Sequence, residues 1–233
     1  MHVLVIDIGG SHVKLAVPGG GPRARFDSSP TMTPDEAMSR IRAETAEWTY
    51  DVVSLGFPGR VGPTGPTDEP GNLGSGWVGF DFTAALGHPV RIVNDAVLQA
   101  LGAYQDRRML FLGLGTGLGA ALVTERVAVP LELGELPYDG DGTLMDRLGH
   151  HAIARDGVES WAAVIHDVVP RLQRAFLADY VVLGGGNVAR LDRLPPHTAR
   201  GNNDDAMHGG VLLWREIVEP HDRDASPFWR VVE

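Results

Sequence analysis

The chain has 233 residues, a formal net charge of −10 and no cysteine. This length allows one large domain or two modest ones, each with a hydrophobic core. The lack of cysteine excludes disulfides, thiolate catalysis and cysteine-based zinc sites, and the negative charge argues against a general nucleic-acid surface. No signal-like segment precedes the first apolar run, and no run approaches the ~18 residues of a membrane span. We therefore expect a cytoplasmic protein without a membrane partner.

The chain begins with a pattern that predicts a strand, a glycine turn and a second strand. Residues 3–8 are apolar, and residues 13–17 are apolar again after the turn. A dinucleotide fold or a P-loop would place a helix directly after its glycines. Glycines in such a hairpin let backbone N–H groups approach phosphate oxygens, although a plain hairpin turn is the alternative. The residues of interest here are Asp7, Gly9, Gly10, Ser11 and Lys14, the only lysine of the chain.

The next segment predicts alternating helices and strands around one long loop. A helix over 34–48 is expected to start at Thr33, a good N-cap with Glu36 three residues later. A strand over 52–56 leads into a Gly/Pro-rich loop over 58–79, whose length is typical of a ligand-binding loop or lid. A short helix over 81–86, a strand over 91–93 and a helix over 97–104 follow. The polar residues 105–108 indicate a domain boundary.

The second half repeats the first pattern. A strand over 109–112, a glycine loop over 113–119 and a strand over 118–123 form another hairpin, so one phosphate chain could be held between the two halves. A helix over 159–177 carries Trp161, Ile165, Val168, Leu172 and Phe176 at core spacing, and its Pro170 predicts a kink or break. A strand over 180–183 runs into a third glycine cluster at 184–186. A helix over 206–214 and a loose tail of about a dozen residues end the chain.

Seven short segments are more informative together than singly. They are DIGGSHVK at 7–14, GFPGRV at 56–61, residues 72–77, NDA at 94–96, GLGTGLGAAL at 113–122, ELGEL at 132–136 and LGGGN at 183–187. In this order they resemble the motifs of the ROK group of sugar kinases, within the actin/hexokinase-like superfamily, and most of all its short, polyphosphate-glucokinase-like members. The resemblance covers nearly the whole chain. It implies an α/β, two-domain actin-like ATPase (ribonuclease H-like) fold with a central cleft.

The resemblance also implies how the domains are divided. Residues 1–105 would form an N-terminal α/β domain with the first phosphate loop, the sugar loop and the catalytic aspartate. Residues 106–233 would form a C-terminal α/β domain with the second phosphate loop and the adenosine loop. The last helix could pack back on the N-terminal domain.

The same resemblance assigns roles to individual residues. Asp95 would be the general base that takes a proton from the sugar hydroxyl, while the alternative is that Asn94 and Asp95 only cap the following helix. Asp7 would hold Mg²⁺ or its waters. The sugar contacts would be Asn72, Asn94, Glu132 and Glu135. The phosphate and nucleotide contacts would be Gly9, Gly10, Ser11, Lys14, Gly115, Thr116, Gly117, Gly185 and Gly186.

Two departures from the family pattern leave a second function open. Glu135 stands where the family has a histidine, and two carboxylates in one pocket, Glu132 and Glu135, would repel or shift a pKa. The cysteine cluster of zinc-containing ROK proteins is absent, so no structural zinc is expected. The predicted function is a sugar kinase using ATP or polyphosphate with Mg²⁺ to phosphorylate a hexose, with glucose the expected acceptor. The alternative is a catalytically weak sugar- or nucleotide-binding protein.

The expected partners are a small sugar and a phosphate donor. Nucleic acid is not expected, and because the first strand begins at Val3 we do not expect the DNA-binding segment of ROK repressors. The choice between ATP and polyphosphate stays open, as does the oligomeric state, with a homodimer as one option.

Overall fold

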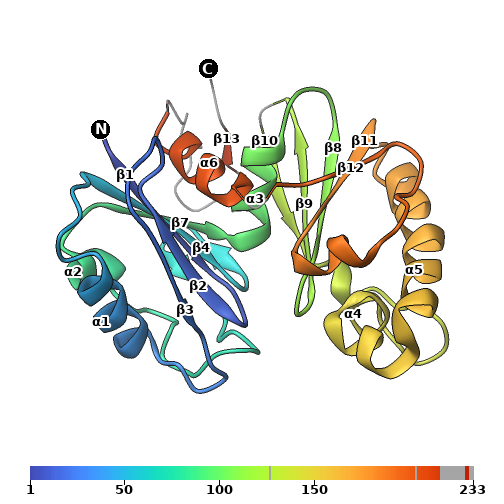
Figure 1. Cartoon of the computed structure of the whole chain (residues 1–233), viewed down its shortest axis with the longest axis horizontal. Helices are drawn as coiled ribbons and strands as arrows, with labels where there is room; N and C mark the ends of the chain where they lie inside the picture. Colours follow the sequence, from blue (N-terminus) through green and yellow to red (C-terminus); the bar gives the residue numbers. More distant parts are fainter. Residues whose placement is uncertain (126, 203, 216–228, 231–233) are drawn as a thin grey trace.

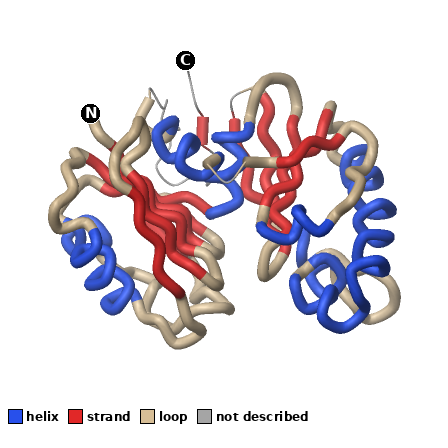
Figure 2. Tube along the Cα trace, in the orientation of Figure 1, coloured by secondary structure: helices blue, strands red, loops and turns tan. Residues whose placement is uncertain are grey.

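The computed structural model describes residues 1–125, 127–202, 204–215 and 229–230. Two mixed sheets stand side by side, and helices α3 and α6 lie between them (Figure 1). Further helices cover the outer face of each sheet (Figure 2). Within the part of the chain that the structure describes, none of the helices has the length and apolar character needed to span a membrane.

The first sheet has the strand order β3-β2-β1-β4-β7. β1, β2 and β3 are antiparallel neighbours, while β4 and β7 run parallel to β1. The bounds are β1 Val3–Ile8, β2 His12–Ala16, β3 Arg23–Asp27, β4 Val52–Phe57 and β7 Val90–Asn94. The predicted strand–turn–strand unit is therefore confirmed, and β3 is an edge strand that the sequence reading did not identify. A small hairpin, β5 Val61–Gly62 with β6 Gly65–Pro66, lies within the long loop.

Helices α1 (Pro34–Glu44) and α2 (Phe82–Leu86) cover the outer face of this sheet. They bury Leu4, Ile6 and Ile8 of β1 in one apolar cluster. The predicted cap is confirmed, because the Thr33 hydroxyl accepts a hydrogen bond from the Glu36 amide and the Glu36 carboxylate accepts one from the Thr33 amide. α1 ends at Glu44 rather than at residue 48. The next residue, Thr45, closes the last turn, because its hydroxyl donates a hydrogen bond to the Ile41 carbonyl.

The second sheet has the order β12-β11-β8-β9-β10-β13. Its hairpin β8–β9 repeats the antiparallel β1–β2 arrangement, and β11 and β12 run parallel to β8. The bounds are β8 Met109–Leu114, β9 Leu118–Thr124, β10 Val127–Leu131, β11 Tyr180–Gly184, β12 Thr198–Arg200 and β13 Trp229–Arg230. The tail expected at the end of the chain lies mostly outside the described residues. Its two described residues form β13, which pairs with β10 rather than hanging free.

Helix α5 (His150–Ala175) covers the outer face of the second sheet, after the short helix α4 (Leu144–Leu148). Its predicted apolar stripe is confirmed, because Trp161, Ile165, Val168 and Leu172 are buried and Phe176 packs at the edge of the same core. The kink or break expected at Pro170 is wrong, because the backbone there keeps helical φ and ψ. Non-helical backbone occurs instead at Gly157, with φ 82° and ψ 164°, a region that glycine enters without steric cost.

Helices α3 (Asp95–Ala103) and α6 (Asp205–Leu212) pack closely against each other. A Cβ at Gly102 would lie 1.8 Å from the Asp205 carbonyl oxygen, and one at Gly209 would lie 1.9 Å from the Leu98 carbonyl oxygen. Glycine at both positions therefore lets the two backbones approach. α6 also packs on β1 and β4, so a late segment of the chain covers the inner face of the first sheet.

Candidate active site

The two glycine turns, far apart in sequence, meet in space. Ser11, in the β1–β2 turn, lies with its Oγ 3.4 Å from the Oγ1 of Thr116 in the β8–β9 turn. A Cβ at Gly10 would lie 2.3 Å from Asn72 Nδ2 and 3.4 Å from Thr116 Oγ1. Glycine at this position therefore lets both turns and the long 58–79 loop converge on one point. Ser11 and Thr116 are exposed residues, so a ligand can approach this point.

Asp7 and Lys14 form an ion pair beside this point. Asp7 is only 4% exposed, and Lys14 Nζ lies 3.3 Å from its Oδ2. Burial raises the pKa of Asp7, while the positive charge of Lys14 and its hydrogen bond act in the opposite direction. The Lys14 side chain is about half exposed, at 46%, so it can also contact a ligand while it holds Asp7.

Asp95 is the first residue of α3, directly after β7. Asn94 is the residue that caps the helix, because its Oδ1 accepts hydrogen bonds from the amides of Ala96 at 3.0 Å and Val97 at 3.3 Å. Asp95 adds a further bond to the Ala96 amide, at 2.8 Å, and remains partly exposed. Capping is therefore achieved by Asn94, which leaves the carboxyl group of Asp95 available for chemistry.

The environment of Asp95 suits a proton acceptor. Burial and the nearby charges of Asp7 and Glu132 together raise the pKa of Asp95 to about 7, while the hydrogen bond from the Ala96 amide acts in the opposite direction. A carboxylate titrating near neutral pH combines substantial basicity with a large ionised fraction, which is what general-base catalysis requires.

The predicted sugar contacts approach the site from three segments. Asn72 packs against Gly10, because its Nδ2 would lie only 2.3 Å from a Cβ placed at Gly10. Asn94 also donates an Nδ2 hydrogen bond to the Gly59 carbonyl at 3.0 Å, so one N–H of its amide stays available for a ligand. Glu132 directly precedes the short 3-10 helix η1 (Leu133–Glu135), Glu135 is its last residue, and both are exposed.

Glu132 is surrounded by charged groups, two of which the sequence reading missed. Partial burial and the charge of Glu135 raise the pKa of Glu132, whereas Arg60 lowers it and Asp68 raises it. Arg60 Nε lies 2.9 Å from Asp68 Oδ2. Arg60 lies within the GFPGRV segment, so its position in a motif was the available signal. Asp68, in the long loop, has no comparable signal in the sequence.

The third glycine cluster is tied to the second turn. Gly185 has φ 85°, and a Cβ there would lie 2.4 Å from the Leu114 carbonyl oxygen. Asn187, in the single turn η2 (Gly186–Arg190), is buried and donates an Nδ2 hydrogen bond to the Gly115 carbonyl at 2.9 Å. No atom would contact a Cβ at Gly186. The predicted Gly185 and Gly186 thus lie beside Gly115, and Asn187 is a structural link that the sequence reading left out of the site.

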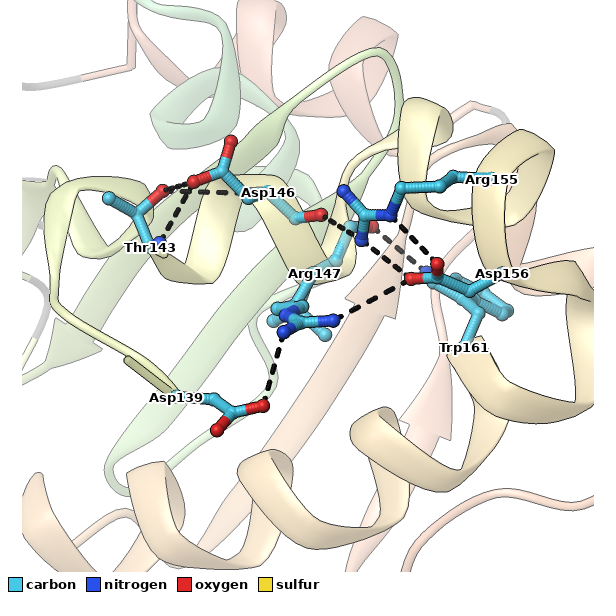
Figure 3. Close-up of polar contacts among 8 residues, drawn as sticks. Asp139, Thr143, Asp146, Arg147, Arg155, Asp156 and Trp161 are labelled. Atoms are coloured by element: carbon cyan, nitrogen blue, oxygen red, sulfur yellow. Dashed lines mark hydrogen bonds and ion pairs between the residues drawn. The ribbon is translucent and has the colours of Figure 1, made fainter. Parts of the chain in front are cut away.

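A charged network holds the corner between α4 and α5 (Figure 3). Arg147 lies between Asp139, at 3.1 Å, and Asp156 Oδ2, at 3.8 Å, while Arg155 donates to both carboxylate oxygens of Asp156, at 2.7 Å and 2.5 Å. Directly after this corner the His150 amide donates to the Thr116 carbonyl at 3.2 Å. The first residue of α5 therefore helps to fix the turn that carries Thr116.

The residues present fit a magnesium ion that arrives with a phosphate donor. Among the described residues, no three or more ligating side chains gather around one point. Mg²⁺ usually keeps several waters and binds through one or two carboxylates plus substrate phosphates. The buried carboxylate of Asp7 could be such a ligand for Mg²⁺, and it lies close enough to Asp95 to affect the pKa of Asp95.

Comparisons with known proteins bear on the fold. No family model matches the chain. A polyphosphate glucokinase from Mycobacterium leprae is 26% identical over 224 residues, covering 82% of this chain and 65% of that protein. Among solved structures, an inorganic polyphosphate/ATP-glucomannokinase from Arthrobacter sp. strain KM is 24% identical, with a TM-score of 0.78 over 89% of this chain and 96% of that one. A ROK family glucokinase from Streptomyces griseus, in complex with glucose and AMPPNP, is 16% identical, with a TM-score of 0.74 over 90% and 97%.

The chain has the fold of the ROK family kinases. The α/β fold class expected from the sequence motifs is thereby confirmed, and the resemblance to ROK proteins holds in both sequence and structure. The chain spans about two thirds, 65%, of the length of the curated glucokinase that it matches. A ROK fold by itself does not determine an activity, because function depends on the residues of the site.

Proposed function

We propose that this protein is a sugar kinase that transfers a phosphoryl group from ATP or polyphosphate to a hydroxyl of a hexose, with glucose the first acceptor to test. The observation that carries the proposal is the Asp95 carboxyl group, whose pKa is raised to about 7. Its electrostatic neighbour Asp7 precedes one of the two glycine turns that meet at Ser11 and Thr116. The names of the similar proteins, a polyphosphate glucokinase and a polyphosphate/ATP-glucomannokinase, support the same reaction class.

In the proposed reaction the ionised Asp95 accepts the proton of the attacking sugar hydroxyl. A bond forms between the sugar oxygen and the terminal phosphorus, and the bond from that phosphorus to the bridging oxygen breaks, leaving the donor one phosphate shorter. General-base catalysis of this kind contributes roughly 10²–10⁴ in rate. The remaining stabilisation comes from positioning and from positive charge around the transferred group.

The chain's own groups would hold the donor and the sugar. Lys14, the Thr116 hydroxyl and the backbone amides of the two turns would contact the phosphates. Asn72, the spare N–H of Asn94 and the carboxylate of Glu132 would bind sugar hydroxyls. Bound Mg²⁺, held through Asp7, would neutralise negative charge on the phosphates.

The test is a coupled assay of sugar phosphate formation with ATP and with polyphosphate, on wild-type protein and Asp95→Asn. We expect the variant to lose two or more decades of kcat, because asparagine keeps the size and the hydrogen bond to Ala96 but cannot accept a proton. Wild-type kcat/KM should fall as pH drops through about 7, where Asp95 becomes protonated. A variant that retains more than a tenth of wild-type kcat would remove Asp95 from this role.

A second function is favoured by one observation, the proximity of Glu132 and Glu135. Glu135 stands where the family pattern has a histidine, which could donate a hydrogen bond. The charge of Glu135 also raises the pKa of Glu132. This arrangement supports a protein that binds sugar or nucleotide with little turnover. Thermal shifts with ligand but little product in wild type, together with a gain of about tenfold or more in glucose kcat/KM in Glu135→His, would favour it. Unchanged turnover in Glu135→His would count against it.

A further inference from the structure

The inner face of the first sheet carries a row of charged residues that leads away from the candidate active site. In the strand register, Asp7 of β1 lies opposite Lys14 of β2, and Lys14 lies opposite Arg25 of β3. On the other side, Asp7 lies opposite Gly56 of β4, where an added Cβ would come 3.4 Å from Asp95 Cα. Because partners in register share a face of the sheet, Asp7, Lys14 and Arg25 point to the same side as Asp95.

Arg25 differs from the cations around it. Lys14 is paired with Asp7, Arg23 lies 2.5 Å from Asp204, and His12 lies 3.4 Å from Asp27. Arg25 is exposed and makes no ion pair or side-chain hydrogen bond with the residues that the structure describes. It is therefore a guanidinium with all its donors available, next to the one lysine of the chain.

A bound anion would stabilise this placement. Two like charges directly opposite each other on one face of a sheet destabilise the pairing. The one carboxylate of the row, Asp7, is already engaged by Lys14. The same face of β2 and β3 also carries Asp27 opposite His12, from which it lies 3.4 Å away, so the carboxylate nearest to Arg25 on its own strand has another basic side chain beside it. The planar fork of arginine matches phosphate oxygens in a bidentate manner.

The position of Arg25 also suggests the shape of the anion. Among the described strands β3 is the edge of its sheet, so none of them covers the far side of Arg25. The third glycine cluster, at Gly185 and Gly186, lies instead beside the second sheet. If the base of a nucleotide is bound at that cluster, the nucleotide extends toward the second sheet and does not contact Arg25. A chain of phosphates could instead continue from Lys14 across the edge of the first sheet to Arg25.

We propose that Lys14 and Arg25 form an anion-binding strip that takes an inorganic oligophosphate, with Arg25 contacting phosphates beyond the one that is transferred. This inference rests on the proposed function for its biological meaning, because it assigns the donor of that reaction. The binding itself does not require turnover.

The test is a titration calorimetry measurement with tripolyphosphate, without sugar, on wild-type protein and Arg25→Gln. We expect Arg25→Gln to weaken tripolyphosphate binding by about tenfold or more, the effect expected from losing a charge-assisted bidentate contact. Mg-ATP binding should change by less than about threefold. Arg107→Gln removes the same charge from an exposed loop, so it controls for net charge and should leave both affinities unchanged.

Equal binding of tripolyphosphate by wild type and Arg25→Gln would overturn the proposal, as would equal losses for tripolyphosphate and Mg-ATP. If circular dichroism shows that Arg25→Gln does not fold, Arg25→Lys replaces it, because it keeps the charge. Arg25→Lys should bind tripolyphosphate with an affinity between those expected for wild type and Arg25→Gln. Wild-type affinity in Arg25→Lys would overturn the bidentate contact. Turnover is measured separately with both donors. Absence of turnover with either donor, together with a selective loss in Arg25→Gln, would reject the proposed kinase and retain the strip.

Discussion

At the scale of single residues, Asp95 couples the proposed chemistry to stability. Its folded-state pKa of about 7 lies above its ordinary value of 3.8, so between these pH values the folded chain holds a proton that the unfolded chain has lost. The contribution of Asp95 to the free energy of unfolding therefore falls as pH rises from about 4 and reaches its lowest value above about 7.

Asp95→Asn should consequently be more stable than wild type at pH 8, because it removes a carboxylate whose ionisation the folded protein disfavours. At pH 4 the two proteins should melt at nearly the same temperature. Calorimetric melting at both pH values measures the difference, and a variant that is less stable than wild type at pH 8 would show that the carboxylate is not held at a raised pKa.

The sequence predicted the central residues of the candidate site better than those around it. Asp7, Asn94 and Asp95 lie at or next to a strand end, and Lys14 lies in the strand that follows the first glycine turn, so local order along the chain indicates them. Arg25 could not be found in this way, because its relation to Lys14 depends on the register of β2 with β3. The roles of the predicted residues stay predictions until the variants are measured.

At the scale of elements, the closest packing lies between α3 and α6. Gly102→Ala would place a methyl group 1.8 Å from the Asp205 carbonyl oxygen, which forces the two helices apart. The expected loss is about 1–3 kcal/mol or more from overpacking, against about 1 kcal/mol gained from the better helix propensity of alanine. Urea denaturation should show a net loss of stability.

Gly71→Ala is a suitable control for this substitution. No atom lies within 4 Å of a Cβ placed at Gly71, and we expect little change in the denaturation midpoint. If Gly102→Ala were as stable as Gly71→Ala, the close contact between α3 and α6 at Gly102 would be contradicted.

The same scale explains which elements the sequence could and could not predict. α1 was predictable because its cap uses Thr33 and Glu36, both within one turn of sequence. β3, with the sequence RARFD, does alternate polar and apolar residues, but Ala24 and Phe26 are its only apolar residues, so the signal is short and was missed. Pro170 did not break α5, because the apolar stripe around it is packed on the sheet and tertiary packing overrides local preference.

At the scale of the whole molecule, one apolar cluster joins the two sheets. It contains Val3, Val5 and Val52 of the first sheet together with residues of α3, α6 and the second sheet. Ser54 of β4 adds polar links, since its hydroxyl donates to the Gly210 carbonyl at 2.6 Å and accepts from Trp214 Nε1 at 2.9 Å. The Arg91 guanidinium lies 4.3 Å from the centre of the Trp214 ring. We propose a division into domains at residues 105 and 106, and this cluster implies that the two depend on each other.

We therefore expect a fragment of residues 1–105 not to fold by itself. Without α6, the inner face of β1 and β4 loses its cover and the buried Ser54 hydroxyl loses both partners, each of which destabilises the fragment. The fragment should bind a hydrophobic dye and melt without a sharp transition, whereas the intact chain should unfold in a single transition by fluorescence and circular dichroism.

Mixing the 1–105 fragment with a fragment of residues 106–233 should restore cooperative melting, because the second fragment supplies α6. A cooperative transition of the 1–105 fragment alone, at a temperature close to that of the intact chain, would show that the first sheet is stable without the shared cluster.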